Sequence, residues 1–75
     1  MKHVRDFITS VVVKEVFDGK EYKKARVAIG LPQNRAAEFA GISPGFLVDI
    51  EAGRRNTGRE TQEKLVEALN RWRRA

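Results

Sequence analysis

The chain has 75 residues and no cysteine, which suits one small domain with an aliphatic core and excludes disulfides and thiolate metal sites. Its formal net charge of +5 favours an anionic partner, with nucleic acid ahead of a membrane surface. No apolar run approaches the ~18 residues of a membrane span and no signal-peptide pattern opens the chain, so we expect a cytoplasmic protein without a membrane partner.

The first predicted element is a helix over residues 4–17, because apolar residues recur there at helical spacing. The alternative is a β-hairpin that turns at Asp18 and Gly19, a strong two-residue turn signal. Pairing across that turn leaves neither face apolar on both strands and sets Lys14 opposite Lys23, so we favour the helix. Its apolar face carries Val4, Phe7, Ile8, Val11, Val12 and Val16.

A second helix is predicted over residues 19–29. Asp18 and Glu21 have the spacing of a capping box, although Asp replaces the usual Ser or Thr. Gly30 fits the left-handed backbone position just past a helix end. The inward-facing residues are expected to be Tyr22, Ala25 and Ile29.

Residues 33–56 read as two short helices joined by one tight turn and followed by a basic loop, which is the build of a helix-turn-helix. The helices are expected over residues 33–40 and 44–52. Gly41 supplies the backbone freedom of the turn, and Ser43 is a good N-cap for the second helix.

The last predicted helix follows Thr57, which is expected to cap it with Glu60 three residues on. Trp72 is interpreted as the edge of the core. Glu51, in the preceding helix, is interpreted as a structural residue that bonds the backbone or an arginine after the turn. The inner face of the last helix is expected to carry Thr61, Leu65, Ala68, Leu69 and Trp72.

Charge is distributed unevenly along the chain. Residues 33–53 sum to −2, whereas residues 1–32 sum to +3 and residues 54–75 to +4. The predicted helix-turn-helix is therefore locally acidic, and the positive charge is carried by the segments on either side of it.

Residues 31–43 read Leu-Pro-Gln-Asn-Arg-Ala-Ala-Glu-Phe-Ala-Gly-Ile-Ser, and they are followed by Leu47, Ile50, Glu51, Gly53 and Arg55. This combination and spacing resembles the Cro/phage-repressor (XRE) helix-turn-helix family, over roughly residues 19–72. The resemblance implies an all-α fold, a small five-helix bundle of the lambda-repressor-like type with an extra N-terminal helix. We divide the chain into a helical extension for packing or dimerisation, residues 1–18, and a helix-turn-helix domain, residues 19–75.

The resemblance also implies roles at the matching positions. Gln33, at the start of the first helix of the motif, would bond a DNA phosphate and brace the second, recognition helix. The expected contacts to the DNA backbone are Gln33, Arg54, Arg55, Asn56, Thr57 and Arg59. The outward positions expected to face base edges are Pro44, Gly45, Val48 and Asp49.

Several of those outward positions depart from the family pattern. Pro44 and Gly45 have no polar side chain, and Val48 offers only van der Waals contact. Asp49 can accept from a cytosine amine but repels phosphate, and it is equally interpretable as a surface salt-bridge partner. Specificity would then rest on apolar contacts, on DNA shape or on a basic arm, or the helix does not read DNA.

Phe39 is a large apolar residue where the family has a polar one. The N-terminal extension has apolar residues that also need a partner, so the two sets are expected to pack on each other or across a dimer. This possible interaction surface comprises Val4, Ile8, Val11 and Phe39.

These features together predict a transcriptional regulator of the repressor or controller type that binds double-stranded DNA as a homodimer. One alternative is a protein-interaction module on the same scaffold, of the antitoxin or adaptor type, and another is a sequence-indifferent DNA binder. Neither a catalytic set nor a phosphate-cradling loop is present, and one histidine without cysteine makes no metal site. We therefore expect no enzyme activity, cofactor or metal.

Overall fold

The computed structural model describes residues 17–74, and this part of the chain is all-α. The helix predicted over residues 4–17 lies outside the described residues. The hairpin alternative is excluded because residues 19–28, which would form its second strand, are helical. The described helices are α2 (Gly19–Ala28), α3 (Gln33–Ala40), α4 (Pro44–Glu51) and α5 (Arg59–Arg74).

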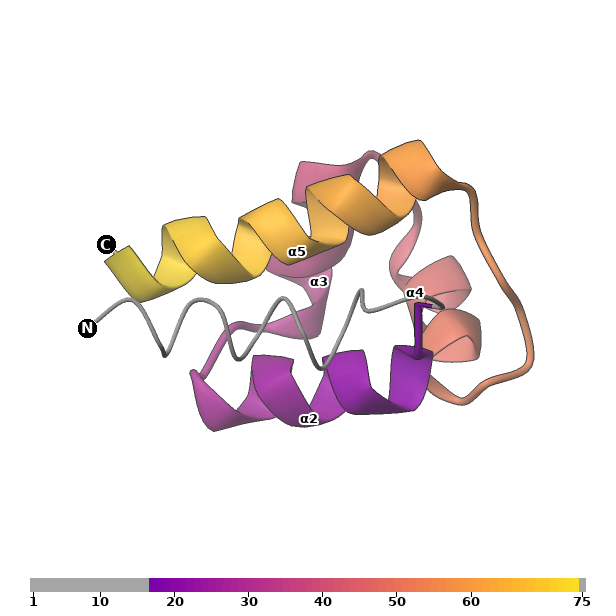
Figure 1. The fold of residues 1–75 in the computed structure, drawn as a ribbon, viewed down its shortest axis with the longest axis horizontal. Coiled ribbons are helices and arrows are strands. Elements are labelled where there is room, and N and C mark those ends of the chain that lie inside the picture. The colour runs from indigo at the N-terminus through magenta and orange to yellow at the C-terminus, as the bar shows by residue number, and fades with distance from the viewer. Residues whose placement is uncertain (1–16, 75) are drawn as a thin grey trace.

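The four helices pack around one core, with α2 and α5 on opposite sides of it (Figure 1). The helix α3 lies behind α5, and α4 packs at one end, beside the beginning of α2. The loop between α4 and α5 swings around that same end. This arrangement places α4 and the basic loop together at one end of the domain, with α3 leading into them from its middle.

Two of the three predicted N-caps, Asp18 and Ser43, are confirmed. The Asp18 carboxylate accepts hydrogen bonds from the backbone N–H groups of Lys20 and Glu21, at 3.0 and 3.4 Å. The Ser43 hydroxyl accepts from the backbone N–H of Phe46 at 3.1 Å. The second half of the expected capping box differs, because the Glu21 carboxylate pairs with Lys24 at 3.3 Å.

Three helix boundaries differ slightly from the sequence expectation. The helix α2 ends at Ala28, and α4 ends at Glu51, each one residue early. The helix α5 begins at Arg59, one residue later than a Thr57 cap would place it. Gly58 lies between Thr57 and the first helical residue, so Thr57 is one position too far away to cap α5. It contacts this end through its backbone carbonyl, which accepts from Gln62 Nε2 at 2.7 Å.

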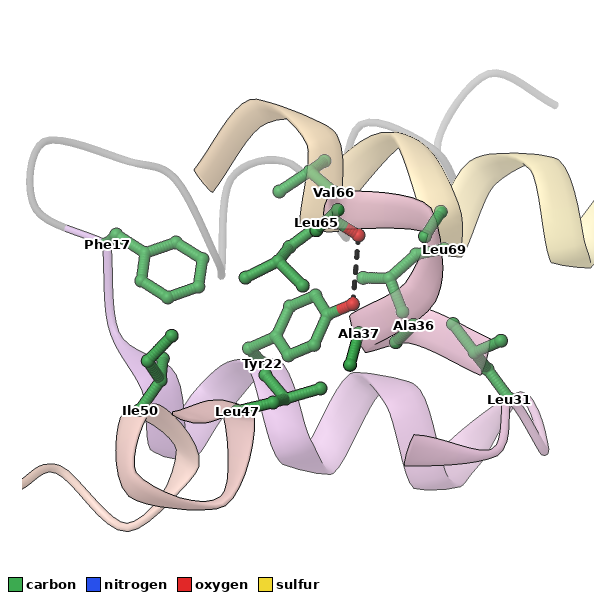
Figure 2. Close-up of a cluster of buried hydrophobic side chains, with 12 residues drawn as sticks. Phe17, Tyr22, Leu31, Ala36, Ala37, Leu47, Ile50, Leu65, Val66 and Leu69 are labelled. Atoms are coloured by element: carbon green, nitrogen blue, oxygen red, sulfur yellow. Dashed lines mark hydrogen bonds between the residues drawn. The ribbon is translucent and has the colours of Figure 1, made fainter. Parts of the chain in front are cut away.

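Tyr22 of α2 occupies the centre of the core (Figure 2). Its ring lies among aliphatic side chains, including Leu47 of α4 and Leu65 of α5, and its hydroxyl donates to the Leu65 carbonyl at 2.9 Å. Phe17 packs 5.8 Å from it between ring centroids. The buried apolar residues are Phe17, Tyr22, Leu31, Ala36, Ala37, Ala40, Leu47, Ile50, Leu65, Val66, Ala68 and Leu69.

Burial raises the pKa of the Tyr22 phenol well above its ordinary value of 10.0, and the negative charge of Glu51 raises it further, while Arg26 opposes them. At alkaline pH the folded domain therefore keeps the Tyr22 phenol proton, which the unfolded chain releases. The contribution of this phenol to the free energy of unfolding is complete below pH ~10. It falls as the pH rises beyond that, by at most about 1.4 kcal/mol per pH unit.

We therefore expect the urea midpoint to fall between pH 9 and pH 11 in the wild type, and to fall less in Tyr22→Phe. Lysines titrate in the same range, so the difference between the two proteins isolates the phenol. Tyr22 is the only tyrosine, so tyrosinate absorbance reports on this one group and should rise only together with unfolding. Tyrosinate formation in the folded protein near pH 10 would contradict the burial argument.

Candidate nucleic-acid interface

The helix-turn-helix is formed by α3 and α4, which are joined through Gly41. This glycine has φ 73°, a left-handed conformation that favours glycine, and its N–H closes the end of α3 on the Glu38 carbonyl at 3.1 Å. Small residues on the inner side of α3 let neighbouring helices approach closely. They are Ala36, Ala37 and Ala40, all buried.

A buried ion pair fixes α4 to the rest of the domain. Arg26 of α2 donates to both carboxylate oxygens of Glu51, from Nε at 2.8 Å and from Nη2 at 3.0 Å. Its Nη1 donates to the Leu31 carbonyl at 2.9 Å. This bidentate ion pair, together with the bond to the Leu31 carbonyl, holds the last turn of α4 in one orientation. Glu51 is structural, as expected, but its partner is Arg26 and not an arginine after the turn.

Gln33 joins this network from the first turn of α3. Its side-chain Nε2 donates to the same carboxylate, at 3.0 Å from Glu51 Oε1. The expected bracing role of Gln33 is therefore present. The residue before it, Pro32, occupies the N-cap position and makes no side-chain hydrogen bond to the helix. The first N–H groups of α3 thus keep their affinity for an anion.

The outward side of α4 carries little polarity. Pro44 and Gly45 are exposed, and a Cβ on Gly45 would meet no heavy atom within 4 Å beyond its chain neighbours and its own helix backbone. Val48 is 40% exposed. Phe46 is half-buried, and the Arg55 guanidinium lies over its ring at 5.5 Å from the centroid. The structure therefore leaves a shallow, largely apolar face beside the basic loop.

Asp49 is the acidic exception on this side, and it binds the basic loop. Its Oδ1 accepts from Arg54 Nε at 3.1 Å and from Arg54 Nη2 at 2.8 Å. Its Oδ2 lies 3.7 Å from Arg55 Nε. All three side chains are at least a third exposed, so these ion pairs position the arginines more than they stabilise the fold. Of the two interpretations of Asp49 from the sequence, the salt bridge is the one observed.

The remaining loop residues lie between this cluster and α5. Asn56 is exposed and Thr57 is half-buried. Arg59, in the first turn of α5, pairs with Glu63 at 3.2 Å on a well exposed surface. An exposed pair of this kind holds the arginine only weakly, so its guanidinium is free to exchange to another anion.

Sequence reasoning missed one cation at this end of the domain. Lys20, in the first turn of α2, lies against the turn that follows α4, since a Cβ built on Gly53 would stand 3.2 Å from Lys20 Cε and 3.9 Å from its Nζ. Residues 20 and 53 are far apart in the chain, so spacing gave no signal of this contact. The helix α2 therefore adds a positive charge beside the turn at Gly53, which leads into Arg54 and Arg55.

Among residues 17–74, no group of histidine, cysteine, aspartate and glutamate side chains is arranged to hold a metal ion. None of the helices in this range combines the length and the apolar character that a membrane crossing requires.

Comparison with known protein families matches residues 23–71 to a helix-turn-helix family model, which is well over half of the chain. No curated protein and no solved structure matches. The matched region contains most of α2, the whole α3–α4 unit, the basic loop and most of α5. The chain therefore belongs to the Cro/repressor-like (XRE) helix-turn-helix family of DNA-binding domains.

Proposed function

We propose that this protein is a transcriptional regulator of the repressor type, which binds an inverted repeat in duplex DNA as a homodimer and blocks access to a promoter. The observation that carries the proposal is the network of Arg26, Glu51 and Gln33, which holds α4 rigidly beside a cluster of cations. A rigid helix next to a basic loop is what docking into the major groove requires.

In this proposal α4 enters the groove and its flanks meet the phosphates. The N-terminus of α3 directs its free N–H groups and Gln33 at one phosphate. The loop after α4 and the start of α5 meet the next phosphates along the strand. The proposed contacts to the DNA backbone from that region are Arg55, Asn56, Thr57 and Arg59. Arg54 directly precedes them in the same loop. The positions that face base edges are Pro44, Gly45, Val48 and Asp49.

Arg55→Ala is expected to weaken binding by a similar factor on all duplexes, because a phosphate contact carries no base information. If the wild type makes ~5–6 phosphate contacts per complex, log K should fall with log salt at a slope near −5, and Arg55→Ala should lower that slope by about 1. Fluorescence anisotropy with labelled duplexes at several salt concentrations measures both quantities.

Arg74→Ala is the matched control, because it removes the same charge at the far end of α5, away from the basic loop (Figure 1). It should leave the salt slope nearly unchanged. If Arg55→Ala altered the preference at a single base pair, the phosphate assignment would be wrong. Equal affinity of the wild type for selected and random duplexes at physiological salt would instead favour a sequence-indifferent binder.

The dimer is proposed to form through an open hollow of about 410 Å³ between α3 and the last turns of α5. Phe39 and Trp72 are each 40% exposed there, and Arg71 lies over the Phe39 ring at 5.4 Å. Arg35 and Glu38 flank Phe39 on α3, so two copies related by a two-fold axis can set each arginine against the partner's glutamate. The hollow is lined by Leu31, Arg35, Glu38, Phe39, Ala68, Arg71 and Trp72.

Phe39→Ala is expected to weaken self-association at least tenfold, because aromatic anchors in an apolar hollow dominate interface energetics. Val27→Ala is the matched control, since Val27 is 60% exposed on α2, away from this hollow. Sedimentation equilibrium of both variants measures the dimer constant. A wild type that stays monomeric at high concentration, with and without DNA, would exclude the dimer and favour the alternative of a docking module for a different protein.

A further inference from the structure

The recognition helix has no side chain that reads guanine in the usual way. Residues 44–51 contain no arginine or lysine, and the outward positions before Asp49 are proline, glycine and valine. The commonest specific contact in the major groove is an arginine that donates two hydrogen bonds to guanine O6 and N7. If such a contact exists in this protein, its guanidinium has to come from outside α4.

The structure places two guanidinium groups against the outward side of α4, and that of Arg54 makes the shorter contacts to Asp49, since Arg55 Nε stays 3.7 Å from Oδ2. Arg54 lies just beyond the helix, but its side chain turns back and donates from Nε and Nη2 to Asp49 Oδ1, at 3.1 and 2.8 Å. The backbone of Arg54 is held by the same residue, since its N–H donates to the Asp49 carbonyl at 2.9 Å. The turn that makes this possible passes through Gly53, which has φ 82°.

The donors that remain on Arg54 suit a base edge. A guanidinium has five N–H groups, and the contacts to Asp49 use one on Nε and one on Nη2. The second N–H of Nη2 and a parallel N–H of Nη1 point forward from the end of the side chain. That pair has the geometry of the bidentate donor that matches guanine O6 and N7. The side chain of Arg54 is 62% exposed, so the forward edge is open to a ligand.

We propose that Arg54, held in place by Asp49, is the principal base-reading group of this protein and selects a guanine in the major groove. This inference rests on the proposed DNA binding. Asp49 is a positioning residue, because holding Nε and Nη2 fixes the long side chain before DNA arrives and reduces the entropy lost on binding. The Asp49 carboxylate also disfavours a phosphate beside Arg54, which it hydrogen-bonds directly, whereas Arg55 is only 3.7 Å from Oδ2 without a hydrogen bond and is freer to turn to a phosphate.

The test begins with selection from a random duplex library with the wild-type protein, followed by affinities for the best duplex and its single-base variants. We expect at least one position where guanine is preferred about tenfold or more. Arg54→Lys keeps the charge but loses the two parallel N–H donors of the guanidinium. It should therefore remove most of the guanine preference and leave the salt slope unchanged. Asp49→Asn should weaken the preference at the same position.

Two comparisons keep the result specific. Arg74→Lys is the charge-preserving control and should keep the guanine preference. Circular dichroism should show that Arg54→Lys and Asp49→Asn both remain folded, because the two side chains are exposed. The inference is overturned if Arg54→Lys leaves the base preference intact, or if Asp49→Asn raises affinity for all duplexes alike, which would make Asp49 a competitor of phosphate. Wild-type protein that binds no duplex would overturn the proposed function as well, whereas tight binding without an Arg54-dependent position overturns this inference alone.

Discussion

Gly19→Ala is expected to lower the melting temperature by ~10 °C or more, although alanine is the better helix former. A Cβ at this position would stand 1.9 Å from the Ile50 carbonyl oxygen and 2.7 Å from its carbon. These atoms belong to the backbone, and the same oxygen accepts from the Gly53 N–H at 3.1 Å, so it cannot swing aside. The helices α2 and α4 would have to separate, at a cost of about 3 kcal/mol.

Gly45→Ala is the matched control for this substitution. It places the same methyl group in the first turn of α4, where the space is open, and so it should be neutral or stabilise by about 0.5–1 kcal/mol. Thermal unfolding followed by circular dichroism compares the two variants directly. Equal melting temperatures for Gly19→Ala and the wild type would mean that α2 and α4 are less closely packed than the structure shows.

Arg26→Met is expected to destabilise the domain by about 3–5 kcal/mol, because it leaves Glu51 buried without its cation. The Glu51 side chain is only 2% exposed and that of Arg26 is 9% exposed, so water cannot take over the lost contacts. A chain of this length has a total stability of roughly 4–11 kcal/mol, so this single change removes a large share of it. Urea denaturation measures the loss as a shift of the midpoint.

The double variant Arg26→Met with Glu51→Leu separates the buried charge from the packing. With no charge left in the interior, much of the lost stability should return, and the two single changes should not add. Recovery will be incomplete, because Gln33 and the Leu31 carbonyl lose partners that they have in the wild type. Strict additivity of the two substitutions would mean that the pair contributes little beyond its volume.

The parts of the fold that depend on local chemistry could be predicted from the sequence. Asp18 and Ser43 cap the helices that they were expected to cap, because an N-cap bond reaches only two or three residues along the chain. The glycines at positions 30, 41 and 53 end their helices in the left-handed conformation for an equally local reason. Thr57 was the exception, since the neighbouring Gly58 let the helix begin one residue later.

Contacts between distant segments were harder to predict. The expected partner of Glu51 was the backbone or a nearby arginine after the turn, whereas the actual one, Arg26, is 25 residues away on another helix. Gly19 was interpreted only as a turn or helix-start residue, and nothing in its neighbourhood indicated that the Ile50 backbone would lie against it. Val66, one residue beyond Leu65, was left out of the expected inner face, but α5 buries a wider stripe than that spacing indicated.

The sequence named the positions of the candidate site but did not indicate how their side chains are arranged. The sequence identified Asp49, Arg54 and Arg55 separately, and it left Asp49 open between a base contact and a salt bridge. Which role applies depends on the turn at Gly53, because that turn decides whether the arginines point back to α4 or away from it. Side-chain direction at a loop is a three-dimensional outcome, and no helical period encodes it.

The bracing of α4 from its buried side also has a consequence for redesign. Arg26, Glu51 and Gln33 hold the helix from within, while Gly45 and Val48 face open space and touch none of these groups. The outer positions can therefore be randomised in a library with little effect on folding. Because Gly45 and Val48 carry no polar group, any DNA preference selected from such a library can be assigned to the side chains introduced there.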